Sequence, residues 1–262
     1  MLNYKIYTAE NVAENDPEWV TFVHGAGGSS NIWFRQIKAF KAHYNVLLID
    51  LRGHGNSKKS GKLEKKYSFK KVSQDVIDVL DHLQIPESHF IGISLGTILI
   101  REISEIRPNV VKSMVMAGAI LKLNVSSQIL MRVGYLLHRV LPYMTIYKLF
   151  ARVILPKRKH KPSRNVFVNE AKKLYRKEFI RWYKLTSEVN PLLRFFRQNK
   201  TSTPSIYIMG GEDYMFLPAV SLFVKENISA HLNVIPNCGH IVNVQAADQF
   251  NAVALSFLGG VK

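Results

Sequence analysis

Short apolar runs and helical patterns alternate along most of this 262-residue chain. Buried strands are indicated by the runs WVTFVH (19–24), YNVLLIDL (44–51), HFIGIS (89–94), VVKSMVMAG (110–118), PSIYIMGG (204–211) and HLNVIPN (231–237). Helical patterns lie near 31–42, 68–83, 96–107 and 243–258. This alternation predicts an α/β fold, with a mostly parallel central sheet that is flanked by helices on both faces.

Residues 121–200 interrupt the alternation. They show no strand pattern, and their apolar residues recur at helical spacing, in one stripe made of Ile129, Leu130, Val133, Leu136, Leu137, Val140 and Leu141. The segment holds 19 Lys and Arg residues against three acids, which is nearly all of the chain's net charge of +17. We therefore predict a core domain of residues 1–120 and 201–262 and a helical, strongly basic insertion of residues 121–200, called the basic segment below.

The pentapeptide Gly92-Ile93-Ser94-Leu95-Gly96 lies between an expected strand and an expected helix. Glycines two positions on either side of the serine permit a sharp turn. Such a turn exposes the serine hydroxyl and directs the N-terminus of the helix at it, which favours developing negative charge. A serine before a helix is also a common N-cap, so the pentapeptide alone leaves both roles open.

A serine nucleophile needs a base, and the base needs an acid that orients it. His240 follows the strand expected at 231–237, and Asp213 follows the strand expected at 204–211. Because parallel strands end at one edge of a sheet, we expect Ser94, Asp213 and His240 to converge there, in the chain order Ser, Asp, His. Glu212 adjoins Asp213, and only one of these two carboxylates can face His240.

The reaction also needs donors for an oxyanion. The glycine-rich loop from His24 to Gly28 directly follows a central strand, and glycines let backbone N–H groups approach a ligand closely. The N–H groups of Ala26 and Leu95 are the expected pair. The loop has no Gly-Lys-Ser/Thr ending and no dinucleotide-type spacing, which argues against phosphate binding.

Taken together, the motifs HGAGG, DLRGHGNS, GISLG, GGED and GH resemble those of the α/β-hydrolase superfamily, in its esterase- and lipase-like branch with a helical cap. The resemblance covers almost the whole chain outside residues 121–200. It implies that Ser94 is the nucleophile, His240 the general base and Asp213 the orienting acid, with Ala26 and Leu95 forming the oxyanion hole. It also implies that the basic segment is a cap, and that His54 is structural.

The resemblance implies a serine hydrolase that cleaves carboxylic esters with an apolar acyl chain through an acyl-serine intermediate. A serine at the turn, in place of an aspartate, argues against dehalogenase and epoxide-hydrolase members. Other functions of the same fold stay open, namely a ligand sensor or regulatory protein, a carbon–carbon hydrolase, a thioesterase and a cofactor-free perhydrolase. Cys238 is interpreted as packing filler, and no metal or organic cofactor is expected.

The charge of the basic segment has several interpretations: a solvated surface, an acidic substrate, nucleic acid, or an anionic membrane surface. No nucleic-acid-binding motif is present. The expected partners are a small ester or lipid substrate and, through the basic segment, the surface of an anionic membrane. Without a signal pattern or an apolar stretch long enough to span a bilayer, the chain is expected to be cytoplasmic, with peripheral membrane contact.

Overall fold

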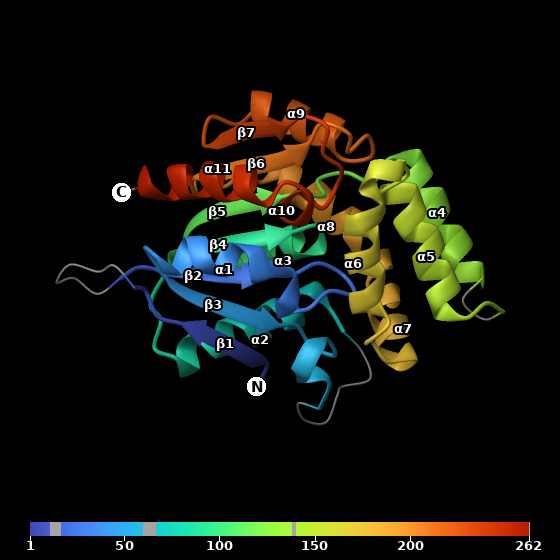
Figure 1. Cartoon of the computed structure of the whole chain (residues 1–262), viewed down its shortest axis with the longest axis horizontal. Helices are drawn as coiled ribbons and strands as arrows, with labels where there is room; N and C mark the ends of the chain where they lie inside the picture. The colour runs from blue at the N-terminus through green and yellow to red at the C-terminus, as the bar shows by residue number, and fades with distance from the viewer. Residues whose placement is uncertain (11–16, 60–66, 138–139, 262) are drawn as a thin grey trace.

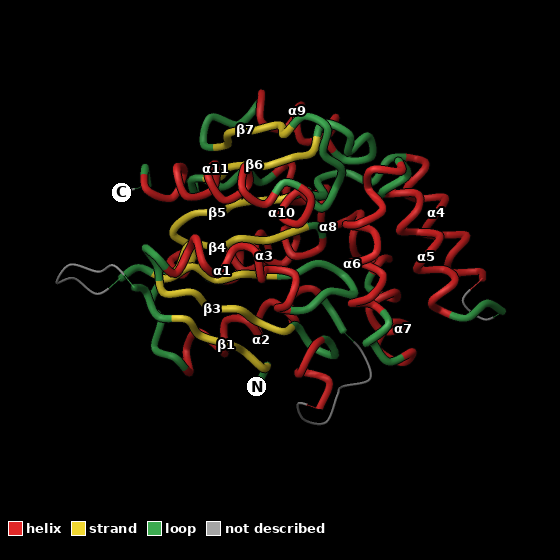
Figure 2. Tube along the Cα trace, viewed as in Figure 1, coloured by secondary structure: helices red, strands yellow, loops and turns green. Residues whose placement is uncertain are grey.

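A seven-stranded sheet forms the centre of the computed structural model, which describes residues 1–10, 17–59, 67–137 and 140–261 (Figure 1, Figure 2). The strand order is β1-β3-β2-β4-β5-β6-β7, and only the pairing of β1 with β3 is antiparallel. This confirms the mostly parallel sheet. The strands are β1 (Asn3–Tyr7), β2 (Trp19–Val23), β3 (Asn45–Asp50), β4 (Ser88–Ile93), β5 (Val111–Ala117), β6 (Ser205–Gly210) and β7 (Ala230–Ile235).

The strands expected from the sequence all form, and most of these apolar runs are buried between layers of helices, whereas β7, at one edge of the sheet, is only partly buried. Every residue of β3, β4 and β6 is buried, as expected for parallel strands that are covered on both faces. The edge strand β1 was not expected. It has only five residues, and its exposed Ile6 and its Lys5 give it no continuous apolar run.

The helices of the core lie on both faces of the sheet. Helices α1 and α11 pack together on one face, and α2 and α3 pack together on the other (Figure 1). The pattern at 243–258 forms two helices, which are separated at Ala246, and α9 was not expected. The core helices are α1 (Phe34–Lys41), α2 (Phe69–His82), α3 (Leu95–Ile106), α9 (Leu217–Lys225), α10 (Val242–Gln245) and α11 (Ala247–Gly259).

The chain between β5 and β6 is helical wherever the structure describes regular elements in it. Its helices are α4 (Val125–Leu137), α5 (Tyr143–Ile154), α6 (Lys161–Ala171), α7 (Arg176–Lys184) and α8 (Thr186–Gln198). Helices α4 and α5 lie side by side and are the outermost elements at that end of the molecule (Figure 1). Within the described ranges, no helix is both long and apolar enough to cross a bilayer.

Candidate active site

Ser94 lies on a strained turn between β4 and α3. Its backbone has φ +54° and ψ −121°, a conformation that side-chain-bearing residues rarely adopt and that costs about 1–3 kcal/mol. The turn is held by two backbone hydrogen bonds: the Ser94 N–H donates to the Ala117 carbonyl at 3.0 Å, and the Thr97 N–H donates to the Ser94 carbonyl at 2.9 Å. The surrounding sheet therefore enforces the strained conformation.

The two glycines of the pentapeptide are required by close packing. A Cβ atom on Gly96 would lie 2.3 Å from the carbonyl oxygen of Val23, and one on Gly92 would lie 2.5 Å from the Ile100 side chain. Gly25, in the loop after β2, lies against the same turn, where a Cβ atom would be 3.2 Å from that of Ser94. The turn and the glycine-rich loop are thus packed backbone to backbone.

A chain of hydrogen bonds joins the side chains of Ser94, His240 and Asp213, which were expected from the sequence to lie together. Ser94 Oγ lies 3.0 Å from His240 Nε2, and His240 Nδ1 lies 2.7 Å from Asp213 Oδ2. A carboxylate only accepts hydrogen bonds, so Nδ1 carries the proton, and Nε2 of the neutral ring accepts one from the serine hydroxyl. The side chains of His240 and Asp213 are almost completely buried. The structure therefore brings the three residues together as expected, while their roles in a reaction stay predictions.

Glu212, the neighbour of Asp213, faces a different part of the molecule. Its carboxylate lies 2.9 Å from Lys157 Nζ, 2.6 Å from Lys159 Nζ and 2.8 Å from His160 Nε2, all in the basic segment. Hydrogen bonds from Lys159 and Lys157 hold the pKa of the Glu212 carboxyl at about 2. Asp213 is therefore the carboxylate that faces His240, and Glu212 connects the core to the basic segment.

The two backbone amides expected to bind an oxyanion have no acceptor within the described residues. The neighbouring Gly27 N–H donates to His54 Nε2 at 3.0 Å, and the Gly28 N–H donates to the Gly25 carbonyl at 3.1 Å. The N–H groups of Ala26 and Leu95 make no such bond, and both residues line the cavity that contains Ser94. Leu95 is also the first residue of α3, where unpaired N–H groups favour negative charge.

Buried side chains hold the loop of Ala26 in place. His24 Nδ1 donates to the Gly25 carbonyl at 2.8 Å, which is the carbonyl of the peptide that carries the Ala26 N–H. His54 accepts the Gly27 N–H, as noted above, and its Nδ1 donates to the Arg52 carbonyl at 3.1 Å. The hydroxyl of Tyr147, on α5, donates to the Ala26 carbonyl at 2.9 Å. Tyr147 could not be identified from the sequence, because it belongs to no motif and the contact spans 121 positions.

The two histidines that hold this loop, His24 and His54, predict how stability depends on pH. Burial lowers the pKa of His24, and burial together with the nearby His24 lowers the pKa of His54 well below its usual range. Below about pH 6.5 the unfolded chain binds protons that the folded chain does not. The free energy of unfolding should therefore fall with decreasing pH, by up to about 1.4 kcal/mol per pH unit for each histidine. Denaturant unfolding at several pH values measures this slope.

The variant His54→Gln should reduce that slope, and His43→Gln, which changes an exposed histidine, should leave it unchanged. A slope in His54→Gln equal to that of the unmodified protein would contradict the assignment.

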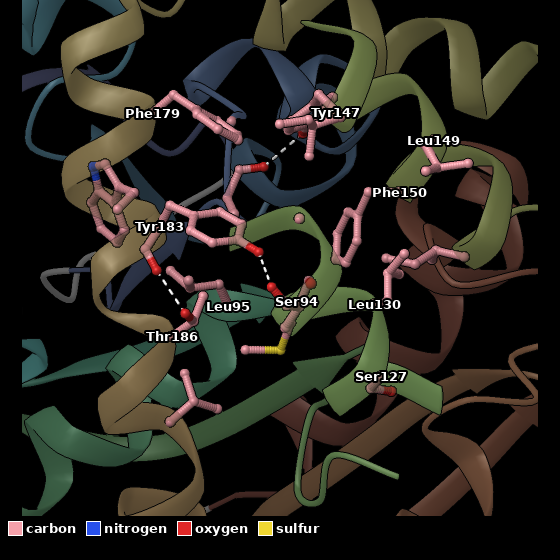
Figure 3. A pocket seen from close by; sticks show the side chains of 18 of the residues that line it. Ser94, Leu95, Ser127, Leu130, Tyr147, Leu149, Phe150, Phe179, Tyr183 and Thr186 are labelled. Carbon is pink, nitrogen blue, oxygen red and sulfur yellow. Dashed lines mark hydrogen bonds between the residues drawn. The ribbon is translucent and has the colours of Figure 1, made fainter. Parts of the chain in front are cut away.

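A cavity of about 190 Å³ lies over Ser94, and its wall comes from both the core and the basic segment. Figure 3 shows Phe150 from α5, and Phe179 and Tyr183 from α7, around the space beside Ser94 and Leu95. No Lys, Arg, Asp or Glu lines it within the described residues. The described cavity wall is thus apolar and uncharged, although the basic segment supplies part of it.

The apolar stripe predicted at 129–141 divides between two environments. The residues that line the cavity are Leu130, Val133, Leu137 and Leu141. Ile129, Leu136 and Val140 are exposed instead. At α7, Tyr175 just before the helix is exposed, whereas Phe179, Trp182 and Tyr183 line the cavity.

Cys238 is buried two residues before His240. Burial raises the pKa of its thiol to about 12, so the thiolate form that acts as a nucleophile is strongly disfavoured. This agrees with the interpretation of Cys238 as packing filler.

Comparisons with known proteins agree with this geometry. The family model of the alpha/beta hydrolase fold matches residues 18–152. The chain is 28% identical over 246 residues to the dihydrolipoyllysine-residue acetyltransferase component of the acetoin cleaving system of Pseudomonas putida, covering 91% of this chain and 63% of that protein. It is 36% identical over 86 residues to 3-oxoadipate enol-lactonase 1 of Acinetobacter baylyi, covering 33% of this chain and 30% of that protein.

Among solved structures, the enol-lactonase from Burkholderia xenovorans LB400 superposes with a TM-score of 0.79 at 18% identity, over 98% of this chain and 96% of that chain. This similarity concerns the fold alone. The chain spans less than two thirds of the length of the two curated relatives named above. Because the family model matches more than half of this chain, the chain belongs to the family with the alpha/beta hydrolase fold.

Proposed function

We propose that this protein is a serine hydrolase that cleaves carboxylic esters with neutral, apolar acyl groups. The observation that carries the proposal is the hydrogen-bonded chain Ser94–His240–Asp213, which faces an apolar cavity beside two backbone amides that have no acceptor in the described part of the chain. A serine with a base and an orienting acid performs nucleophilic catalysis, and a binding protein or sensor has no need of this arrangement. The relatives named as enol-lactonases support the proposal, because a lactone is a cyclic ester.

In the proposed reaction, Ser94 Oγ attacks the ester carbonyl while His240 Nε2 takes the hydroxyl proton. The N–H groups of Ala26 and Leu95 stabilise the negative oxygen of the tetrahedral intermediate. The bond to the alcohol then breaks, His240 donates its proton to the leaving alcohol, and an acyl-Ser94 remains. A water molecule, deprotonated by His240, then attacks the acyl carbonyl, the bond to Ser94 Oγ breaks, and His240 returns the proton to Oγ as the acid leaves. Asp213 holds the ring in the required tautomer throughout.

The lack of charged side chains in the described cavity wall restricts the kind of acyl group that can bind. The lactone named in the enol-lactonase relatives derives from 3-oxoadipate, a dicarboxylic acid, and therefore keeps a free carboxylate. A buried carboxylate without a cationic partner is costly. Since no Lys or Arg lines the described cavity, we infer that this chain takes neutral acyl groups. We also infer that residues 121–200 act as a cap over the substrate.

Two aryl esters of equal chain length test this substrate class. We expect p-nitrophenyl butyrate to exceed p-nitrophenyl hemisuccinate in kcat/KM by at least about 100-fold, because the hemisuccinate would bury an unpaired carboxylate. The rate should also rise from acetyl to longer acyl esters, since each buried CH₂ contributes about 0.8 kcal/mol. Equal turnover of the butyrate and the hemisuccinate would contradict the neutral substrate class.

A further inference from the structure

The outer faces of α4 and α5 expose apolar side chains to solvent. Ile129 is 54% exposed and Leu136 is 72% exposed. The whole set, called the α4–α5 face below, contains Val125, Ile129, Val133, Leu136 and Val140 from α4 and the turn after it, and Leu149 from α5. Scattered exposed apolar residues are ordinary, but a helix with an apolar stripe on its solvent side usually has a partner there.

Basic residues accompany the apolar ones on these helices. Arg132 is exposed on α4, and Lys148 and Arg152 are exposed on α5. At 100° per residue, Arg132 projects from the same side of α4 as Ile129 and Leu136. The face therefore combines an apolar stripe with positive charge, which is the composition of helices that lie in a membrane interface.

The acids of the basic segment do little to neutralise this face, because each of the three accepts a hydrogen bond from the core. Glu170 accepts a hydrogen bond from Ser29 Oγ at 2.6 Å, and Glu178 accepts one from the Tyr67 hydroxyl at 2.5 Å. Glu188 accepts one from the Phe69 N–H at 3.4 Å, and of the three it is the one that also lines a surface pocket with Arg132 and Leu136. The densest basic run, residues 157–161, adds less positive charge to the protein surface than its number of basic residues suggests. Its Lys157 and Lys159 are paired with Glu212 of the core.

The α4–α5 face is continuous with the cavity over Ser94. Val133 and Leu149 are exposed and also line the cavity, so they form part of its rim. On the inner side of the same helices, Leu130 and Phe150 line the cavity wall. The apolar lining thus extends from Val133 and Leu149, which are partly exposed to solvent, to Leu130 and Phe150, which lie near Ser94 in Figure 3.

We propose that the α4–α5 face binds an anionic lipid surface. Ile129, Leu136 and their apolar neighbours enter the boundary between headgroups and acyl chains, and Arg132, Lys148 and Arg152 contact the lipid phosphates. This orientation places the rim of the cavity at the lipid surface. A second copy of the chain fits the face less well, because a symmetric contact would bring the same three cations together.

Vesicle co-sedimentation tests the proposal. The protein carries Ser94→Ala in every sample, so binding does not depend on the proposed reaction. We expect it to bind vesicles of equal parts phosphatidylcholine and phosphatidylglycerol and to bind phosphatidylcholine vesicles much more weakly. Binding should decrease as salt rises, because the Debye length is only about 10 Å at 0.1 M ionic strength. Equal binding to both kinds of vesicle, or binding to neither, would overturn the proposal.

Matched variants locate the surface. The triple variant Arg132→Gln, Lys148→Gln, Arg152→Gln should lose about 100-fold in partitioning, since each basic residue near an anionic surface contributes about a factor of five. The double variant Ile129→Gln, Leu136→Gln should also lose binding. The matched controls are Lys38→Gln, Lys70→Gln, Lys225→Gln for charge and Leu222→Gln, Ile228→Gln for exposed apolar residues elsewhere.

In the background with Ser94 intact, both test variants should hydrolyse a small soluble ester at the normal rate, because none of the changed residues lines the cavity. Control variants that lose vesicle binding as strongly as the test variants would overturn the assignment to this face. So would a stable dimer that the Ile129→Gln, Leu136→Gln variant dissociates in sedimentation, because it would assign the face to a second copy of the chain.

Discussion

Replacing Ser94 with alanine is expected to lower kcat/KM for p-nitrophenyl butyrate by about four to six orders of magnitude. The loss is large because Ser94 supplies the atom that forms the covalent bond, and His240 and Asp213 act only through it. The residual rate comes from the oxyanion donors and the cavity. Steady-state kinetics on purified protein measure the effect, and Ser256→Ala, which changes an exposed serine on α11, is the matched control.

A Ser94→Ala protein that keeps its fold by circular dichroism and retains more than about a tenth of the activity would contradict the proposed reaction. In that case the turn at Ser94 would have a structural role, and hydrolysis would occur at another site.

Replacing Asp213 with asparagine is expected to lower kcat by about three to four orders of magnitude. The amide keeps the shape of the carboxylate, but it can donate to His240 Nδ1, and the ring then carries its proton on Nε2, where it cannot accept the serine proton. The adjacent Glu212→Gln is a matched control, because it makes the same chemical change one residue away. It weakens the contacts to Lys157, Lys159 and His160 and should retain most of the activity.

The reverse result, with Glu212→Gln inactive and Asp213→Asn near normal, would assign the acid to Glu212. It would require the two carboxylates to exchange places relative to the structure. The pH profile separates the roles further, since only the acid that contacts His240 should alter the pH dependence of kcat/KM.

The core of the fold could be predicted because its signals are local. Most strands of the parallel part of the sheet are apolar runs that are buried on both faces, with the edge strand β7 only partly buried. The turn at Ser94 needs glycines at Gly92 and Gly96 for packing reasons that depend on few neighbours. Strand β1 was missed because an edge strand buries one face and leaves a mixed pattern, as Lys5 and Ile6 show.

The site could be predicted as far as the ends of strands determine it. Parallel strands place Ser94, Asp213 and His240 at one edge, and this follows from chain order and topology. The choice between Asp213 and Glu212 could not be settled from the residues themselves, because it depends on which carboxylate meets Lys157 and Lys159 from the basic segment. Tyr147 was missed for the same reason, since its contact with Ala26 depends on how α5 packs.

In the basic segment, the sequence pattern is not sufficient to assign each apolar residue to the cavity or to solvent. Helical spacing identified an apolar stripe but not its two sides: Leu130 and Leu137 line the cavity, and Ile129 and Leu136, one residue before each, face solvent. One position changes the direction of a side chain by 100°, so the angle at which α4 packs determines each environment. Net charge has the same limitation, because the sequence does not show which lysines are paired with core carboxylates.

The most direct test of the proposed nucleophile is the site of a covalent adduct. A fluorophosphonate probe should add one equivalent to the folded protein, and peptide mass spectrometry should place the adduct on Ser94. Ser94→Ala protein should show no labelling, and His240→Ala protein should label much more slowly, because the hydroxyl then lacks its base. An adduct on a different serine, or labelling of Ser94→Ala protein at the normal rate, would contradict the account.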